Sequence, residues 1–203
     1  MSVRWADLAL EVAQLQQGVT VDLTELLHDL WSKAQQEADT SRLLAALETR
    51  ARRGIFQACD VSARFQHAEL RPGVRHPQVL LDTAEQLAIL RAKVVRDRAE
   101  TVILKATQGL VSPYARLAAQ VLITDAARTG TTAGGLVGGA THKEFIRIRG
   151  AKEPRTHSRY EDTVRPINGT WLIAGIEVDG PGDARLPWSE KAFCGHICRY
   201  FRQ

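Results

Sequence analysis

The residues with the clearest capacity for chemistry lie near the C-terminus of the chain. The stretch FCGHICRYF places Cys194, His196 and Cys198 at alternate positions. Thiolates and imidazoles are preferred zinc ligands, and zinc takes four of them in a tetrahedron, usually from separate segments. His157 is the best ligand from another segment, and either His196 or Asp183 completes the set. These residues predict a candidate zinc site.

The spacing within that stretch sets a condition on the site. On a straight strand Cys194 and Cys198 point to the same face and lie about 13 Å apart at ~3.3 Å per residue, too far to share one ion. One zinc ion therefore requires a tight turn at Gly195. The alternative is that the thiols and His157 fill a small core, because free cysteine is among the most buried residue types.

Bulk composition limits the class of protein. The 203 residues suffice for a sizeable core, in one domain or two unequal ones. No apolar run approaches the roughly 20 residues that span a bilayer, so we expect no membrane role. Asp7 and Glu11 interrupt the first apolar stretch, which is atypical of a signal peptide and predicts a cytoplasmic protein. The three cysteines are an odd number, which disfavours a disulfide framework.

Basic residues are concentrated in one segment. The net charge of +4 favours contact with polyanions. A basic group within about two helical turns can follow DNA phosphates without reading sequence. The alternative is a solvated helix face. The group consists of Arg91, Lys93, Arg96 and Arg98.

Helical periodicity extends over residues 1–130. Amphipathic repeats predict one helix that ends at Gly18, a second that follows it, and a third that begins at Thr40 or Ser41 and is interrupted at Gly54. The stretch RPGVRHP predicts a break, because its prolines and glycine do not fit in one helix.

A long amphipathic helix is predicted at about 78–109, and its length favours packing on partner helices or other subunits. Ser112 and Pro113 then restart a helix that runs to Gly130. The apolar stripe predicted for the long helix consists of Leu80, Ala84, Leu87, Leu90 and Val94.

Beyond Gly130 the pattern changes. Gly130 and the four glycines that follow it predict a hinge over residues 131–142. The segments EFIRIRG, TWLIAGIEVDG and AFCGHICRYF then predict strands, and DGPGD predicts a turn. The fold class is therefore α+β, with a mostly helical N-terminal region and a small β-containing domain at 143–203.

Four pieces of the C-terminal part carry a resemblance to a known family. They are RLAAQVLITDAARTGTTAG, KEFIRIRG, EPRTHSRYED and DGPGD followed by CGHICRY. In this order, over roughly residues 117–200, they resemble the C-terminal portion of the phage Mu F-like (MuF) head morphogenesis proteins. The positions that fit the motifs of the family are Lys143, Phe145, Glu153, Arg155, Thr156, His157, Pro181, Gly182, Asp183, Cys198 and Arg199.

The sequence also departs from that pattern. Tyr160 and Tyr200 stand where members of the family have cysteines, which removes two thiols from any metal site. We expect two ion pairs to hold the domain together: Arg155 is paired to Asp183, and Arg199 is paired to Glu153 or Asp162.

The resemblance implies a minor capsid or head morphogenesis protein of a tailed phage. Such a protein is assembled in the host cytoplasm, lies inside the virion head, contacts the portal and other capsid proteins, and in some cases contacts DNA. It implies no enzyme activity, no small-molecule substrate and no cofactor other than a structural zinc ion.

The rival reading is a small metal-dependent nuclease or a DNA-binding packaging factor. A nuclease of this kind requires a histidine base beside a metal ligand, and His157, Asp162 and Asn168 supply those residue types. The chain contains no G-x-S-x-G, P-loop, His-Glu-x-x-His or Cys-x-x-Cys pattern, so the known catalytic motifs give this alternative no support.

Overall fold

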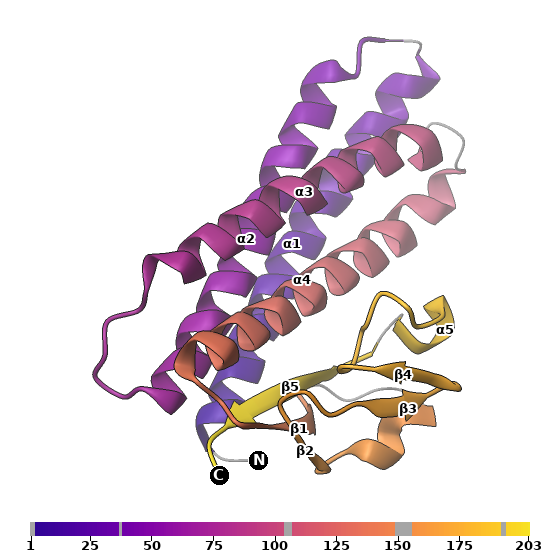
Figure 1. Cartoon of the computed structure of the whole chain (residues 1–203). Coiled ribbons are helices and arrows are strands. Elements are labelled where there is room, and N and C mark those ends of the chain that lie inside the picture. Colours follow the sequence, from indigo (N-terminus) through magenta and orange to yellow (C-terminus); the bar gives the residue numbers. More distant parts are fainter. Residues whose placement is uncertain (1–2, 37, 104–106, 149–155, 192–193) are drawn as a thin grey trace.

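The protein consists of a body of long helices followed by a small domain of short antiparallel strands (Figure 1). The structure is a computed structural model, and it describes residues 3–36, 38–103, 107–148, 156–191 and 194–203. The expected α+β class is confirmed. The long helices are α1 (Val3–Gln35), α2 (Ser41–Leu70), α3 (Gln78–Ile103) and α4 (Gln108–Gly138).

Helices α1 and α2 are each continuous, so the predicted breaks at Gly18 and Gly54 are wrong. In α1 the buried face continues through Val19 and Leu23 beyond Gly18, and this tertiary burial outweighs the weak helix propensity of glycine. In α2 a Cβ atom at Gly54 would overlap the side chain of Val19, so glycine permits close contact between the two helices. The predicted break after α2 is confirmed, because α3 begins only at Gln78.

The predicted helix at 78–109 is divided between two helices, since α3 ends at Ile103 and α4 begins at Gln108. Its predicted stripe is also partly wrong, because the side chains of Leu90 and Val94 are 66% and 41% exposed. Most of the residues on the face of α3 that packs on the body are alanines, which allow a close approach between helices. The buried residues of α3 are Leu80, Ala84, Ala88, Ala92, Val95, Ala99 and Ile103.

The glycine-rich segment is helical, so the hinge predicted for 131–142 is wrong over residues 131–138. Gly130, Gly134 and Gly138 recur every four residues on the face of α4 that meets α2. A Cβ atom at Gly130 would overlap the carbonyl oxygen of Cys59 in α2. These glycines therefore bring two helix backbones together, as in small-xxx-small packing. Helix α4 ends at Gly138 and is capped by Gly139, which has the left-handed φ of 75° typical of a glycine cap.

The C-terminal domain contains two small sheets. Strand β1 is the centre of an antiparallel sheet with the order β2-β1-β5, and β3 and β4 form a separate hairpin. The domain lies along α4 (Figure 1). Its elements are β1 (His142–Arg147), the 3₁₀-helix η1 (Thr156–Tyr160), β2 (Val164–Pro166), β3 (Trp171–Ile173), β4 (Ile176–Val178), α5 (Trp188–Lys191) and β5 (His196–Phe201).

The domain is joined to the body along the outer edge of β5. The side-chain amide of Gln66 on α2 donates to the carbonyl oxygen of Tyr200 at 2.8 Å and accepts from its N–H at 2.9 Å, as a neighbouring strand would. A Cβ atom at Gly135 of α4 would overlap the ring of Tyr200, so this glycine makes room for the strand. The helices thereby cover an edge that would otherwise be open to pairing with another strand.

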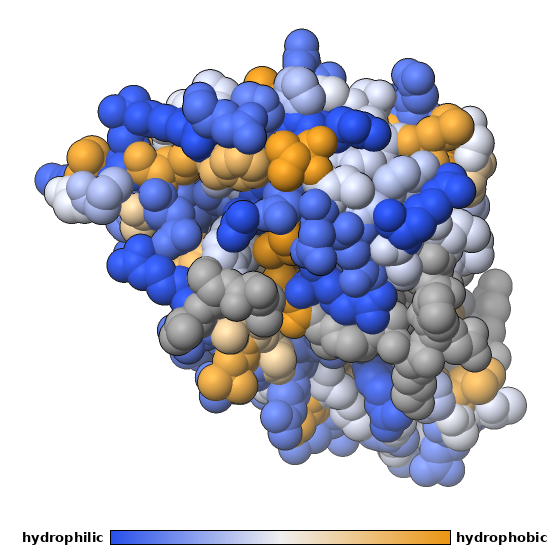
Figure 2. Space-filling model, turned by 90° about the horizontal axis from the view of Figure 1, so that it is seen from below, coloured by the Kyte–Doolittle hydropathy of each residue, from blue (hydrophilic) through white to orange (hydrophobic). Residues whose placement is uncertain are grey.

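The surface of the molecule is mostly polar where the C-terminal domain is seen end-on. Viewed from below, hydrophilic side chains cover most of the surface, and hydrophobic ones occur in separate groups (Figure 2). None of the helices among the described residues combines the length and apolar character that a membrane span requires.

Candidate metal centre

Three of the predicted ligands converge on one point in the C-terminal domain. His157 Nε2 lies 3.2 Å from Cys194 Sγ and 3.2 Å from His196 Nδ1, and the last two atoms are 3.5 Å apart. All three side chains are buried, with exposed fractions of 2% or less. We call this group the His-Cys-His cluster. Among the described residues, no fourth histidine, cysteine or acidic ligand atom joins it.

The local backbone explains how Cys194 and His196 meet. Cys194 precedes β5 and His196 begins it, so the two residues are not both on a straight strand. The guanidinium of Arg128 on α4 donates to the carbonyl oxygens of both residues, each at 2.9 Å. The N–H of Ile148 also donates to the carbonyl oxygen of Gly195 at 2.9 Å. These contacts hold the segment that brings the two side chains together.

Each histidine of the cluster is oriented by a carboxylate. His157 Nδ1 lies 2.6 Å from Glu190 Oε2, and Thr156 donates to the other oxygen of that carboxylate at 2.7 Å. His196 Nε2 lies 2.8 Å from Glu161 Oε1. In metal sites, carboxylates in this position keep the proton on the outer ring nitrogen and direct the inner nitrogen at the ion.

The electrostatics of the cluster favour a thiolate. Burial alone raises the pKa of Cys194, but its hydrogen bonds with His157 and His196 and the charge of Arg128 outweigh it and lower the pKa to about 5. Burial lowers the pKa of His157, but its contacts with Cys194 and Glu190 outweigh this effect and raise the pKa. Without a metal, both shifts favour the charged forms of the two side chains.

Two kinds of chemistry use such a group. A cysteine, a histidine and a glutamate in hydrogen-bonded order are the parts of an activated nucleophile, here Cys194, His157 and Glu190. A nucleophile has to reach a substrate, however, and the thiol of Cys194 is buried. A mechanism with Cys194 as nucleophile also assigns no role to His196, whereas metal binding uses the inward-facing atoms of all three side chains.

Cys198 is not part of the cluster, so its assignment as a ligand is wrong. It lies two residues beyond His196 on β5, and its side chain packs in a second core with Phe145, Trp171 and Val178. Burial raises the pKa of Cys198 to about 12, so it is held there as a neutral thiol. The alternative prediction for the thiols, that they fill a small core, is correct for this cysteine. Asp183, the other candidate ligand, is also absent from the cluster.

An ion pair of Asp183 holds the DGPGD turn. Asp183 pairs with Arg185 at 2.7 Å, and the predicted partner Arg155 lies outside the described residues. Gly182 has a φ of 77° and lies against the guanidinium of Arg128, where a Cβ atom would overlap it. The turn that contains Pro181 therefore contacts the same arginine that holds the cluster.

The arginine near the end of the chain also has a different partner. Arg199 pairs with Glu144 on the neighbouring strand β1 at 2.5 Å, rather than with Asp162. Glu153 lies outside the described residues, and Asp162 is exposed. Antiparallel pairing places Arg199 directly opposite Glu144, a relation that single-strand patterns do not reveal.

The predicted basic group on α3 does not form one surface. At 100° per residue, Arg91 and Arg98 lie on one side of the helix and Lys93 and Arg96 on roughly the opposite side. Arg91 pairs with Asp125 at 3.1 Å, and Arg96 pairs with Glu48 at 2.7 Å.

The residues proposed for a nuclease are not brought together either. Asp162 and Asn168 are exposed, whereas His157 is buried in the His-Cys-His cluster. Neither of the two exposed residues belongs to that cluster.

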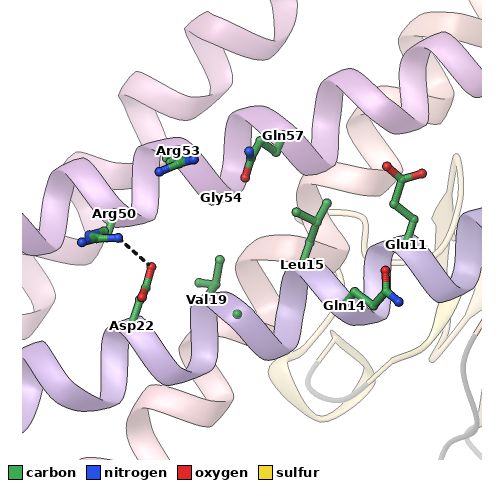
Figure 3. A pocket seen from close by; sticks show the side chains of 10 residues that line it. Glu11, Gln14, Leu15, Val19, Asp22, Arg50, Arg53, Gly54 and Gln57 are labelled. Atoms are coloured by element: carbon green, nitrogen blue, oxygen red, sulfur yellow. Dashed lines mark hydrogen bonds and ion pairs between the residues drawn. The ribbon is translucent and has the colours of Figure 1, made fainter.

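A separate hollow of about 420 Å³ lies between α1 and α2 (Figure 3). Its lining mixes acidic, basic and amide side chains, and Asp22 and Arg50 face each other there at 3.4 Å. Gly18 leaves part of the space, because a Cβ atom there would meet no atom within 4 Å. The hollow contains none of the residues that sequence patterns indicated for chemistry.

Sequence reasoning missed the residues that orient the cluster. Glu190 lies 33 residues from His157, Glu161 lies 35 residues from His196, and Arg128 lies 66 residues from Cys194. No rule of sequence spacing predicts which carboxylate contacts a histidine when the two residues lie on different elements. Comparison with known proteins adds no further assignment, because no protein-family model, curated protein or solved structure matches the chain.

Proposed function

We propose that this chain is a minor capsid or head morphogenesis protein of a tailed phage, internal to the head and associated with the portal. One observation carries the proposal: segments that resemble MuF proteins, on α4 and in the C-terminal domain, contact one another in space. Thr156 contacts Glu190 of α5, the Gly182 turn contacts Arg128, and Arg128 holds the segment that leads into β5. Motifs that meet in space are better support for the resemblance than motifs that merely share an order.

The helical body supports a role in contacts with other subunits. Helix α3 exposes Leu90 and Val94 one turn apart, although both are large apolar residues. Exposed apolar residues that adjoin one another are typical of protein contact sites. The portal or another capsid protein is the partner that the proposed role requires.

The burial of the His-Cys-His cluster supports a structural rather than an enzymatic role. The side chains of Cys194 and His157 are 2% and 1% exposed, so a substrate has no direct approach to them. Contact with packaged DNA is a subsidiary part of the proposal. It would rest on Lys93 and Arg98, which are exposed on different sides of α3.

The decisive measurement is the location of the chain. Mass spectrometry of purified phage particles should detect it, and external protease should leave it intact until the heads are opened. Glutamate at both Leu90 and Val94 should lower its incorporation, whereas Leu172→Glu, at an exposed leucine of β3, should not. Absence of the chain from purified particles would overturn the proposed role.

A cleavage assay tests the nuclease alternative. The purified chain should leave plasmid DNA intact in the presence of Mg²⁺ or Mn²⁺. Cutting that is abolished by His157→Ala but retained by His142→Ala, at a histidine outside the cluster, would replace the structural role with a nuclease.

A further inference from the structure

We infer that His157, Cys194 and His196 bind one zinc ion, through Nε2, Sγ and Nδ1 respectively. Binding at this site does not depend on a role in the phage head. The inference rests on the separations of the three atoms, on the hydrogen-bond partners of the two imidazoles, and on the ligand types.

The separations match a tetrahedral ion. With Zn–N near 2.0–2.1 Å and Zn–S near 2.3 Å, tetrahedral angles place two nitrogens about 3.4 Å apart and a nitrogen and a sulfur about 3.6 Å apart. The nitrogens of His157 and His196 are 3.2 Å apart, and Cys194 Sγ lies 3.2 and 3.5 Å from them. An ion fits at the centre with shifts of a few tenths of an ångström.

The hydrogen-bond partners point to the same conclusion. Glu190 and Glu161 each accept a hydrogen bond from the outer nitrogen of one imidazole, at 2.6 and 2.8 Å. In a neutral imidazole the inner nitrogen is then an acceptor. Two such nitrogens and a sulfur face one another with at most one proton to share, whereas a cation at the centre satisfies all three.

The ligand types select the metal. Thiolate and imidazole suit zinc and other late transition metals, whereas magnesium and calcium prefer oxygen ligands. Three protein ligands leave a fourth position, which no described histidine, cysteine or acidic residue supplies. A site of this kind completes its coordination with water or another added ligand.

The ion would tie two separate segments of the domain together. His157 lies on η1, and Cys194 lies 37 residues later beside β5. A link over this distance restricts the unfolded chain and fixes η1 against the sheet, as structural zinc does in other small domains. An ion at this position would therefore stabilise the fold of the domain.

Metal titration of the full chain tests the inference. Native mass spectrometry should show one zinc ion per chain, removed by a chelator and restored by added Zn²⁺. Cobalt substitution should produce a thiolate-to-cobalt charge-transfer band. Cys194→Ser should abolish this band, and Cys198→Ser, a buried cysteine four residues away, should retain it.

Each outcome decides the matter. If the wild-type chain binds neither Zn²⁺ nor Co²⁺ added in excess, the inference is overturned. The cluster would then be a metal-free group of cysteine and histidine side chains. A charge-transfer band that survives in Cys194→Ser but disappears in Cys198→Ser would also overturn it. If Cys194→Ser does not fold, Glu190→Gln provides the second variant.

The outer carboxylate gives a graded readout. Glu190→Gln should weaken zinc binding by about 10- to 100-fold, because the amide no longer holds His157 in the ligating orientation with a charge. Glu177→Gln, at an exposed glutamate of β4, should leave the affinity unchanged. Equal affinities for the two variants would show that Glu190 does not orient a ligand, contrary to the inferred site.

Discussion

The helical body buries mainly uncharged side chains, whereas the C-terminal domain buries several titratable ones. In the body, aliphatic residues of four long helices form one large core, with Leu23, Ala88 and Ile123 among its fully buried members. The C-terminal domain has a smaller apolar core around Phe145 and Trp171, and beside it lie titratable groups. The buried polar residues of the domain are Lys143, His157, Glu190 and His196.

The difference follows from size. A short segment cannot bury enough apolar surface to hold a unique fold, so small domains commonly add cross-links or metal ions. Buried polar groups stabilise a fold only when their partners are in place. Lys143 illustrates this, because burial lowers its pKa and its ammonium donates to the carbonyl oxygen of Asp179 at 2.7 Å. The body depends on close packing, and the C-terminal domain depends on completed contacts.

The largest expected effect is a test of close packing in the body. Gly130→Ala should lower the free energy of unfolding by about 3 kcal/mol, because the new Cβ atom overlaps the backbone of Cys59 in α2. Gly18→Ala, at a helical glycine with open space, should raise it by about 0.5–1 kcal/mol. Chemical denaturation of both variants measures the contrast. Similar effects at both positions would mean that the helices do not approach as closely as the structure describes.

The joint between the two regions should give the next largest effect. Gln66→Met keeps the shape of the side chain but leaves the N–H and carbonyl of Tyr200 without these partners. We expect a loss of about 2 kcal/mol in the free energy of unfolding. Gln57→Met, at an exposed glutamine on the same helix, is the control. A loss at Gln57 as large as that at Gln66 would assign the effect to the helix rather than to the joint.

A charged contact of the C-terminal domain should make stability depend on acid. Hydrogen bonds from the Arg185 side chain, with its backbone N–H, lower the pKa of Asp183 from 3.8 to about 2. Because the folded-state value lies below the unfolded one, the stabilisation is present above about pH 4 and lost as the pH falls from about 4 to about 2. We expect about 1 kcal/mol, since Arg185 is half exposed and the pair is screened.

Denaturation midpoints of Asp183→Asn and the wild type should therefore differ at neutral pH and converge at about pH 2. Asp82→Asn, at an exposed position of α3 in the body, is the control and should show little difference at either pH. If the difference in midpoint between Asp183→Asn and the wild type stays constant with pH, the charge of this carboxylate is not its cause.

The smallest expected effect concerns the surface of the body. Arg96→Met removes the ion pair with Glu48, but it should change the free energy of unfolding by no more than about 0.5 kcal/mol, because exposed pairs are screened by water. Denaturation at low and high salt measures it. A salt-dependent loss above 1 kcal/mol would mean that the body also relies on charged contacts, which would weaken the contrast with the C-terminal domain.

Sequence patterns located the elements better than their ends. Periodicity indicated helical segments in the body and strands after residue 142, and both are present. Several errors occurred where glycine was treated as a local stop, at Gly18, at Gly54 and over 131–138. A glycine inside a helix costs about 1 kcal/mol relative to alanine, and at Gly134 close packing against the backbone of α2 offsets that cost. The partner helix that makes this possible is distant in sequence.

The same limit applied to the candidate site. Residue type singled out His157, Cys194 and His196, but it also singled out Cys198 with equal weight. The separation is geometric, since Cys198 is one pleat further along β5 and enters a different core. The roles of Glu161 and Glu190 depend on contacts between different elements, and sequence patterns do not predict such contacts.

By itself the sequence determined the α+β class, the order of helices before strands and the residue types from which a metal site could be made, because periodicity and side-chain chemistry are local properties. Only the tertiary structure decided that the glycine-rich segment is a helix, that Arg128 joins the body to the C-terminal domain, and that three particular ligand atoms meet. These outcomes depend on which distant segments pack together. Close contact between backbones and burial of side chains arise only from that packing.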